Sequence, residues 1–139
     1  MEKHIVSTHF GSSMASVATI GEHSVKMDTS PDNGGFNSGP GPKRLMLASL
    51  AGCTGIDVVS ILTKMKVHFS DLKIDTEATL SPEHPKIYDH VKITYSVRIE
   101  KEEDKPKMER AVELSEEKYC GVMAMFRSFA KLERKIVFL

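Results

Sequence analysis

The chain has 139 residues, a length typical of one domain that buries its core without disulfides or metals. Hydrophobic residues make up 40% of it and charged residues 27%, and the formal net charge of zero argues against electrostatic capture of nucleic acid or an anionic membrane. Its first residues, MEKHIVSTHF, have an acidic second position and no apolar run, unlike a signal peptide. We therefore expect one cytoplasmic domain over residues 1–139, with no nucleic acid and no membrane as a partner.

Three β-prone segments open the chain, at residues 4–10, 14–20 and 23–28. The glycine-containing joints between them (GSS and GE) favour hairpins, so the sequence predicts a three-stranded antiparallel meander. Residues 29–42, TSPDNGGFNSGPGP, combine Gly, Pro, Asn and Asp and predict a mobile loop that leads into a helix.

Pro42 suits the first turn of a helix, and the pattern after it predicts a helix to about Lys66. The apolar residues of this segment cover nearly its whole circumference: Leu45, Met46, Leu47, Leu50, Ile56, Val58, Val59, Ile61, Leu62 and Met65. A helix that is apolar on all sides is buried on all sides. A subunit of this size can hardly enclose it, so we expect a second subunit to cover part of it. The longest apolar run, residues 45–56, is too short to cross a bilayer.

Residues 71–80 and 90–100 alternate apolar and polar side chains and predict two half-exposed antiparallel strands. The second strand alternates more regularly, and its inward side chains are expected to be Val91, Ile93, Tyr95, Val97 and Ile99. A helix is predicted from Pro106 to about Tyr119, a shorter one over residues 120–132 and a final strand over 134–139. The order βββ-α-ββ-αα-β predicts an α+β fold with largely antiparallel sheets.

The two cysteines, Cys53 and Cys120, are candidates for chemistry, and they are too far apart in the sequence for a CxxC zinc or redox motif. The six histidines are scattered without ligand spacing, so we expect no bound metal and no cofactor. A buried cysteine is most often a small core residue. Because both cysteines have features typical of reactive thiols, the functional and the structural interpretation stay open at this point.

Cys53 lies on the one side of the long helix that carries polar groups. It shares this face, at helical spacing, with Ser49, Ile56, Asp57, Ser60 and Lys64, and we expect a small cleft along it. The negative charge of Asp57 alone would raise the pKa of a neighbouring thiol. A reactive Cys53 therefore needs a cation close by, and we expect Asp57 to orient that cation or to cap a backbone group.

Cys120 stands where a new helix begins, and a thiol at a helix N-terminus has a lowered pKa. Arg127 follows about two turns later on the same face. Local electrostatics therefore predict that Cys120 is the more acidic of the two thiols.

Two stretches, GPGPKRLMLASLAGCTGIDVVSILTKMK and AVELSEEKYCGVMAM, resemble the OsmC/Ohr family of osmotically induced and organic hydroperoxide resistance proteins. The resemblance runs along the whole chain and is greatest to a branch with the motifs AGCTGIDVVSIL and LSEEKYC. It implies an OsmC-like α+β fold in an intertwined homodimer, with antiparallel sheets that contain strands of both subunits around the two long helices.

The resemblance also implies a cysteine-dependent peroxidase. In the family, the cysteine that matches Cys53 attacks the peroxide O–O bond and becomes a sulfenic acid, and the one that matches Cys120 condenses with it to a disulfide. A dithiol, such as that of a lipoylated protein, then reduces the disulfide. We expect Cys53 to be the attacking residue, because the long helix should form the wall of an apolar pocket for organic hydroperoxides.

The chain departs from the family at one position. Family members use an arginine from the N-terminal part of the chain, held by a glutamate ten residues before the first cysteine. That position is Lys43 here, and no arginine precedes Arg44. A thiol in apolar surroundings without a guanidinium stays protonated and reacts slowly. Either Arg44, Arg127 or Lys43 supplies the cation, or efficient peroxidase activity has been lost.

The function predicted from the sequence is a thiol-dependent reductase of small-molecule hydroperoxides in oxidative-stress defence. The alternative is a non-catalytic or weakly active dimeric module that binds a small apolar ligand or senses oxidants through the same cysteines. A third interpretation is a structural stress protein whose cysteines are only core residues.

Overall fold

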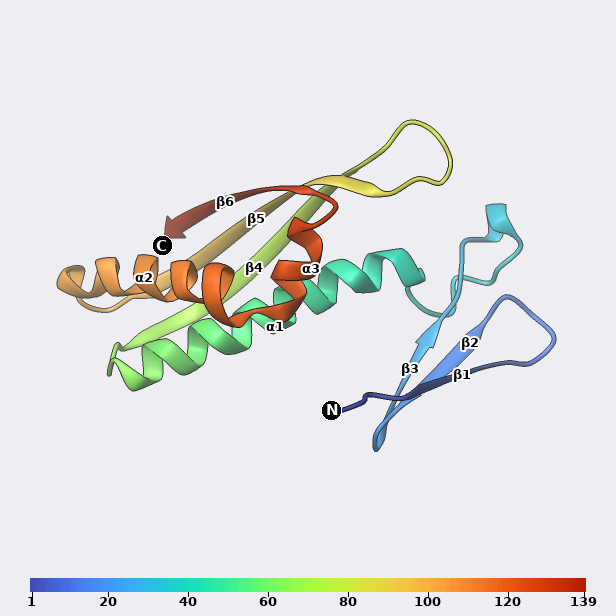
Figure 1. Ribbon diagram of the computed structural model, residues 1–139, viewed down its shortest axis with the longest axis horizontal. Coiled ribbons are helices and arrows are strands. Elements are labelled where there is room, and N and C mark those ends of the chain that lie inside the picture. The colour runs from blue at the N-terminus through green and yellow to red at the C-terminus, as the bar shows by residue number, and fades with distance from the viewer. The chain divides into compact units, whose positions relative to one another are not determined.

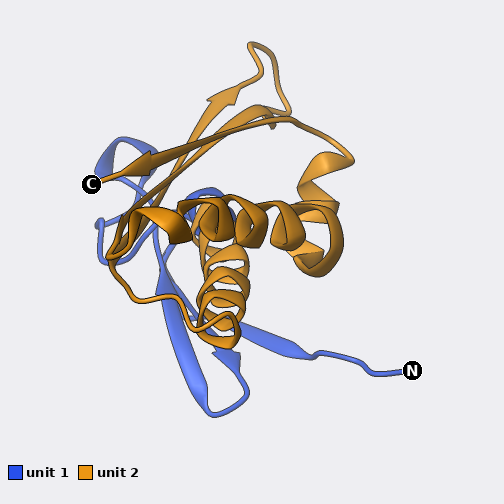
Figure 2. Cartoon of the chain, turned by 90° about the vertical axis from the view of Figure 1, so that its left-hand side faces the viewer, with its two compact units in different colours: residues 1–46 blue, residues 47–139 orange.

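The computed structural model describes all 139 residues and divides into two compact units, Met1–Met46 and Leu47–Leu139 (Figure 2). Its helices and strands follow the predicted order, with one turn of π-helix between the last two helices. The α+β class is therefore confirmed, while the single domain over residues 1–139 stays a prediction.

The first unit is built on a small antiparallel sheet with the strand order β1-β2-β3 (Figure 1). β1 spans Val6–Phe10, β2 spans Ser16–Ile20, β3 spans His23–Met27, and a 3₁₀-helix, η1, spans Pro31–Asn33. This sheet is the predicted meander. The hairpin between β2 and β3 turns at Gly21, whose φ of 60° is left-handed and suits glycine. In β2 only Ser16 and Ala18 are buried.

The loop after β3 is organised around the carboxylate of Asp28, which is only 2% exposed. This carboxylate accepts hydrogen bonds from the N–H groups of Phe36 (3.1 Å) and Ser38 (3.0 Å) and from the Ser38 hydroxyl (2.6 Å). It also accepts one from the N–H of Thr29 at 2.7 Å. A Cβ on Gly35 would come within 2.2 Å of the Thr29 carbonyl oxygen, so only glycine allows this close approach. The sequence predicts a mobile loop here, whereas the structure shows a loop whose own backbone donors converge on one acceptor.

The second unit holds a three-stranded sheet with the order β4-β5-β6 (Figure 1). Its elements are β4 (Phe69–Leu80), β5 (Tyr88–Ile99), the 3₁₀-turn η2 (Glu102–Asp104), α2 (Lys105–Leu114), the π-turn η3 (Ser115–Tyr119), α3 (Gly121–Arg127) and β6 (Lys131–Phe138). The long helix α1 (Pro42–Lys64) continues from the first unit into the second. β4 and β5 are antiparallel, as predicted, but β6 runs parallel to β5.

The end of the chain differs from the prediction in its element boundaries. The sequence predicts a helix over 120–132 and a strand from 134, but α3 ends at Arg127 and β6 begins at Lys131. The pairing of β6 with β5 starts where Lys131 meets His90, so inter-strand hydrogen bonds draw residues 131–133 into the sheet. Tertiary pairing of this kind is invisible to a local pattern.

The core lies where the helices of the second unit cover one face of its sheet (Figures 1 and 2). β5 contributes the inward residues that its alternation predicts, all of them buried: Val91, Ile93, Tyr95, Val97 and Ile99. α1 buries one stripe with a spacing of four residues: Leu50, Thr54, Val58 and Leu62. α2 and α3 add Met108, Ala111, Val112, Met123 and Phe126. Every buried residue of this core cluster belongs to the second unit.

Within one chain, α1 is not buried on all sides. Ile56 is 73% exposed and Val59 41% exposed, so an apolar side of the helix remains open. By length and composition the whole helix could cross a bilayer, although its longest uninterrupted run alone is too short. One such helix is weak evidence for a membrane span, because core helices of soluble proteins meet the same criterion.

Candidate functional site

The fold brings the two cysteines together in the second unit. Cys53 lies near the middle of α1, and Cys120 directly precedes α3. Both are free thiols, Cys53 half-buried and Cys120 only 3% exposed. Their side chains form a hydrogen bond with each other, so ionisation of one thiol affects the other. The residues that the sequence singles out are thus neighbours in space.

The Cys120 thiol is held in its protonated form. Burial raises its pKa to about 12, and the hydrogen bond with Cys53 acts in the same direction. The Met123 N–H donates to the Cys120 sulfur at 3.3 Å and opposes this rise, while the negative charges of Cys53 and Asp57 add to it. The prediction of an acidic Cys120 at a helix start is therefore wrong. The single N–H donor at the start of a seven-residue helix does not offset the loss of water around the sulfur.

Asp57 lies one turn after Cys53 and faces a hydroxyl group where the sequence predicts a cation. Its Oδ2 accepts a hydrogen bond from the Ser115 hydroxyl at 2.9 Å. Asp57 also lines a cavity of about 490 Å³ together with Ser60, Ile61, Lys64, Met65, Leu114 and Tyr119. The polar side of α1 therefore does border a cleft, as predicted, although Cys53 is not part of its lining. The volume is in the range of small-molecule sites.

A chain of polar groups runs on from Asp57 through the core. The Ser115 hydroxyl lies 2.8 Å from the Thr54 hydroxyl, which lies 2.9 Å from the hydroxyl of Tyr95. Tyr95 in turn donates to Glu116 Oε2 at 2.8 Å. Ser115 and Glu116 both belong to the π-turn η3. Backbone irregularities of this kind are often found at functional sites.

The sequence predicts Asp57 as part of the site but not the other members of this hydrogen-bonded network. Tyr95 is predicted only as an inward strand residue, and a buried tyrosine hydroxyl needs a hydrogen-bond partner. That need is a signal which could have been followed, because Thr54 lies beside Cys53 on a helix expected to be buried. Ser115 and Glu116 had no such signal, since their position depends on the π-turn.

The three residues predicted as possible cations, Arg127, Lys43 and Arg44, do not line the cavity that Asp57 borders. The Arg127 guanidinium donates to the backbone carbonyl of Glu116, and Arg127 lines a second cavity with Glu116, Glu117, Leu132 and Arg134. Lys43 and Arg44 lie in the first turn of α1. Nine or ten residues of helix separate them from Cys53, which is about 14 Å along the axis at 1.5 Å per residue. Besides burial, the side chains with the largest effects on Cys120 are Cys53 and Asp57, and neither is a cation.

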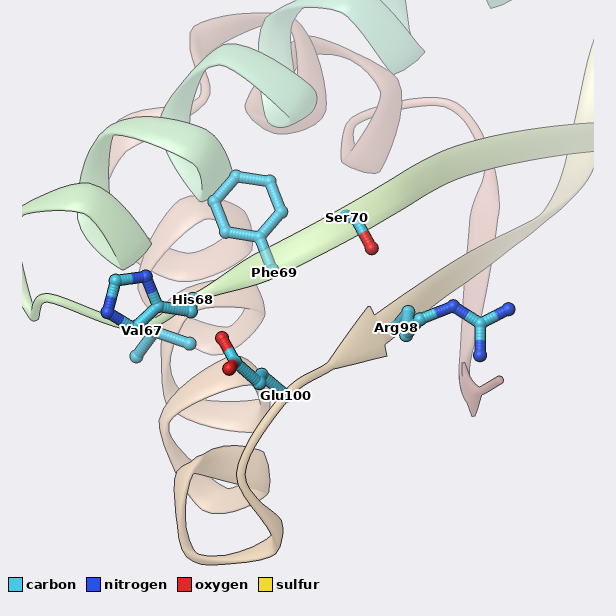
Figure 3. A pocket seen from close by; sticks show the side chains of 6 residues that line it. All are labelled: Val67, His68, Phe69, Ser70, Arg98 and Glu100. Atoms are coloured by element: carbon cyan, nitrogen blue, oxygen red, sulfur yellow. The ribbon is translucent and has the colours of Figure 1, made fainter.

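Two further cavities border the same unit. An open groove of about 660 Å³ runs between α1 and β4, lined by Ala51, Gly52, Gly55, Ile56, Val59, Ser60, Leu72 and Ile74. Another, of about 440 Å³, lies where β4 begins and β5 ends (Figure 3). There Phe69 points toward α1, and Arg98 extends away from His68 and Glu100 (Figure 3). No cysteine lines either cavity, and no three His, Cys, Asp or Glu side chains are grouped to hold a metal ion.

Known proteins resemble this chain in sequence and in fold. It is 34% identical over 103 residues to Protein YhfA of Escherichia coli K12, a match that covers 74% of this chain and 73% of that protein. A hypothetical protein from Aquifex aeolicus VF5 superposes with a TM-score of 0.85 at 29% identity, covering 100% of this chain and 98% of that one. An organic hydroperoxide resistance protein OsmC from Legionella pneumophila superposes with a TM-score of 0.69 at 17% identity, covering 99% and 98% of the two chains, which shows a common fold.

The family model described as OsmC-like protein matches residues 35–134. The matched segment contains α1, β4, β5 and both cysteines, and it ends within β6. These similarities confirm the OsmC-like fold that the two sequence stretches imply. The chain belongs to the OsmC-like protein family.

Proposed function

We propose that this chain is a thiol-dependent hydroperoxide reductase that acts in oxidative-stress defence. The observation that carries the proposal is the pair of free thiols, Cys53 and Cys120, hydrogen-bonded to each other at the edge of an apolar core. Membership of the OsmC-like family supports it, as does the common fold with a protein named for organic hydroperoxide resistance.

Cys53 is the attacking residue in this proposal. The thiolate is the reactive form of a cysteine, and Cys120 is a poor nucleophile at neutral pH because burial keeps it protonated. The Cys53 thiolate attacks the outer oxygen of a hydroperoxide ROOH, and the O–O bond breaks. Cys53 becomes a sulfenic acid, and the leaving alkoxide takes up a proton to give the alcohol.

Cys120 is the resolving residue. Its sulfur attacks the sulfenic sulfur of Cys53, the S–S bond forms and the S–O bond breaks. The thiol proton of Cys120 and the released hydroxide give water. An external dithiol, such as that of a lipoylated protein, then exchanges with the disulfide and is itself oxidised, which restores both thiols. Because this cycle needs a reducing compartment, we place the protein in the cytoplasm.

The proposal includes a homodimer. The open apolar side of α1, with Ile56 and Val59, borders a groove whose walls are almost entirely apolar side chains and glycines. Large exposed apolar patches of this kind mark protein–protein contacts. A second copy of the chain would bury this side of α1. The helix would then be buried on all sides, as its apolar circumference predicts.

A module that senses oxidants or binds a small apolar ligand is the second candidate, and the charges near the thiols favour it. The ionised forms of Cys53 and Asp57 both act on Cys120 with negative charge, where the family's peroxidases have an arginine. Such surroundings disfavour a thiolate. This candidate predicts one round of oxidation without sustained turnover.

Consumption of cumene hydroperoxide in the presence of dihydrolipoamide separates the two candidates. We expect wild-type protein to consume many equivalents and Cys53→Ser to lose at least about 100-fold in rate, as for removal of a nucleophile. In Cys120→Ser, one equivalent of peroxide should leave a sulfenic acid on Cys53 that dimedone traps and mass spectrometry locates. Oxidation of the wild type that stops after one equivalent would favour the sensor. A trapped sulfenic acid on Cys120 in Cys53→Ser, with none on Cys53 in Cys120→Ser, would reverse the two roles.

A further inference from the structure

The buried polar chain beside the thiols has no part in the cycle described above. It consists of two carboxyl groups, Asp57 and Glu116, joined through the hydroxyls of Ser115, Thr54 and Tyr95. The three hydroxyl residues are each 0% exposed, so water does not replace any of their partners. Each member must therefore satisfy its hydrogen bonds within the chain.

The hydrogen bonds of this polar network require one proton more than its three hydroxyl groups supply. Four contacts of 2.8 to 2.9 Å join the five groups, and each contact needs one proton between its two oxygens. The three hydroxyls of Ser115, Thr54 and Tyr95 provide one proton each. If Asp57 and Glu116 were both ionised, Ser115 would donate to Asp57 and Tyr95 to Glu116, and the single Thr54 proton would leave one of the two remaining contacts without a proton. One of the two carboxyl groups must therefore carry the fourth proton.

The two ends of the chain open to different cavities. Asp57 lines the cavity of about 490 Å³ on the polar side of α1. Glu116 lines the cavity of about 400 Å³ that Arg127 and Arg134 also border. The hydroxyl chain is thus a hydrogen-bonded path through the core from one cavity to the other, and the charge at its Asp57 end raises the pKa of the Cys120 thiol.

We propose that Asp57, Ser115, Thr54, Tyr95 and Glu116 form a proton relay that holds one shared proton and serves the cysteine pair. A proton passes from the Glu116 carboxyl to the Tyr95 oxygen while Tyr95 passes its own to Thr54, Thr54 to Ser115 and Ser115 to Asp57. Each hydroxyl gives one proton and receives one, so only the two carboxyl groups change charge. No bond between heavy atoms forms or breaks in this step.

The proton rests on Glu116 before transfer, so this carboxyl donates to Tyr95, the reverse of the direction that holds when Glu116 is ionised. Burial raises the pKa of Glu116, whose side chain is 11% exposed, and the nearby Glu117 adds to this rise. The Tyr95 hydroxyl and the guanidinium groups of Arg134, at 3.6 Å, and Arg127 oppose it without reversing it. At the other end Asp57 accepts a hydrogen bond from the Ser115 hydroxyl, its charge acts on Cys120, and it lines its cavity together with Lys64 and Tyr119.

The relay would act on the resolving step, and this use of it rests on the proposed function. The negative charge of Asp57 raises the pKa of Cys120. When the relay brings a proton to Asp57, that charge is neutralised and the Cys120 thiol ionises more easily. This is the condition that Cys120 needs in order to attack the sulfenic acid on Cys53.

The shared proton can be tested without any peroxide. We expect infrared difference spectroscopy of the intact protein at neutral pH to show one protonated carboxyl group, absent in Glu116→Gln. The signal should also vanish in Asp57→Asn, because the amide of asparagine donates to Ser115 and supplies the fourth proton itself. Glu117→Gln, at the exposed neighbouring position, is the matched control and should keep the signal. A wild type without a protonated carboxyl, or a signal that persists in both Glu116→Gln and Asp57→Asn, would overturn the proposal.

The use of the relay is tested by the rate of disulfide closure after one equivalent of cumene hydroperoxide. Tyr95→Phe interrupts the path in its middle, and we expect closure to slow by at least about tenfold, the scale of a lost proton-transfer step. Tyr88→Phe removes a hydroxyl from a buried tyrosine of the same strand outside the relay and should close at the wild-type rate. Closure in Tyr95→Phe as fast as in wild type would overturn the relay's role. Failure of the proposed function would show as no peroxide reaction in wild type, with the carboxyl signal unchanged.

Discussion

β2 of the first unit buries two of its five side chains, the small Ser16 and Ala18, whereas β5 of the second unit buries six of its twelve, all of them large and apolar or aromatic. Both are the middle strand of a three-stranded sheet, so the number of paired neighbours does not explain the difference. The second sheet has helices packed on one face, and the whole buried core cluster lies there. Strand pairing alone does not make a core; a covered face does.

The pKa values of buried ionisable groups are shifted in opposite directions in the two units. Asp28 in the first unit is surrounded by hydrogen-bond donors, those of Ser38 above all, and they hold the pKa of its carboxyl far below the usual range. For Cys120 and Glu116 in the second unit, burial outweighs the groups that stabilise the ionised form, so their pKa values are raised. The first unit thus stabilises a charge, while the second stabilises protonated groups.

The largest expected effect is the loss of folding stability when a core residue of the second unit is truncated, compared with truncation of a sheet residue of the first unit. Ile93→Ala removes a fully buried side chain and should lower the free energy of unfolding by about 2–5 kcal/mol. Val17→Ala, at a position 41% exposed, should change it by no more than about 0.5 kcal/mol. Chemical denaturation of both variants measures the difference. Equal losses would show that Val17 is covered in the functional assembly and would remove the contrast between the units.

The second prediction asks whether the open side of α1 is covered by a second copy. Ile56→Lys places a charge on this apolar side and should weaken self-association by at least about 100-fold, or about 2.7 kcal/mol. Thr63→Lys, at an exposed position of the same helix that does not line the groove, is the control. Light scattering at micromolar concentration measures both. A folded wild-type monomer under these conditions would contradict the dimer.

The third prediction tests the raised pKa of Cys120. In Cys53→Ser, burial remains the main effect, so alkylation of Cys120 by iodoacetamide at pH 8 should be on the order of 100-fold slower than in the unfolded chain. The rate should keep rising well above pH 9. The sign of the stability effect follows: a raised pKa contributes stability below about pH 8.5, which is lost as pH rises toward the folded value. An alkylation rate that levels off near pH 8.5 would contradict burial as the cause.

Much of this architecture could be predicted from periodicity. The alternation in β5 identifies its buried face, and Pro42 marks the start of α1. The pairing of Cys53 with Cys120 came from the family resemblance, because nothing local connects two distant cysteines. Burial of Cys120 could not be predicted, since it depends on the packing around α3, and this is why the helix-start argument fails.

The polar chain was beyond local patterns for a similar reason. Thr54 and Tyr95 are separately predictable as inward residues, but their contact depends on how α1 lies on β5. Ser115 and Glu116 reach Thr54 and Tyr95 only because the backbone forms a π-turn at η3. No residue pattern predicts that irregularity. Asp28 belongs to the same class: its partners lie up to ten positions further along a loop that composition alone marks as irregular.

The smallest expected effect tests the charge held by the first unit. Asp28→Asn replaces an acceptor oxygen by an amide that faces the N–H groups of Phe36 and Ser38, so donors would meet donors. We expect hydrogen exchange at these two amides to accelerate, while global unfolding stays unchanged because the buried core cluster lies in the second unit. Asp32→Asn, at an exposed position of the same loop, is the control.

The pH dependence in wild type has a definite sign. A carboxyl whose folded pKa is depressed contributes stability above its unfolded pKa of about 3.9, and that contribution is lost only as pH falls further. Protection of the Phe36 and Ser38 amides should therefore persist down to about pH 4. Protection lost already near pH 5 would contradict the depressed pKa of Asp28. Exchange in Asp28→Asn equal to that of wild type would show that backbone packing around Gly35 holds this loop and not the carboxylate.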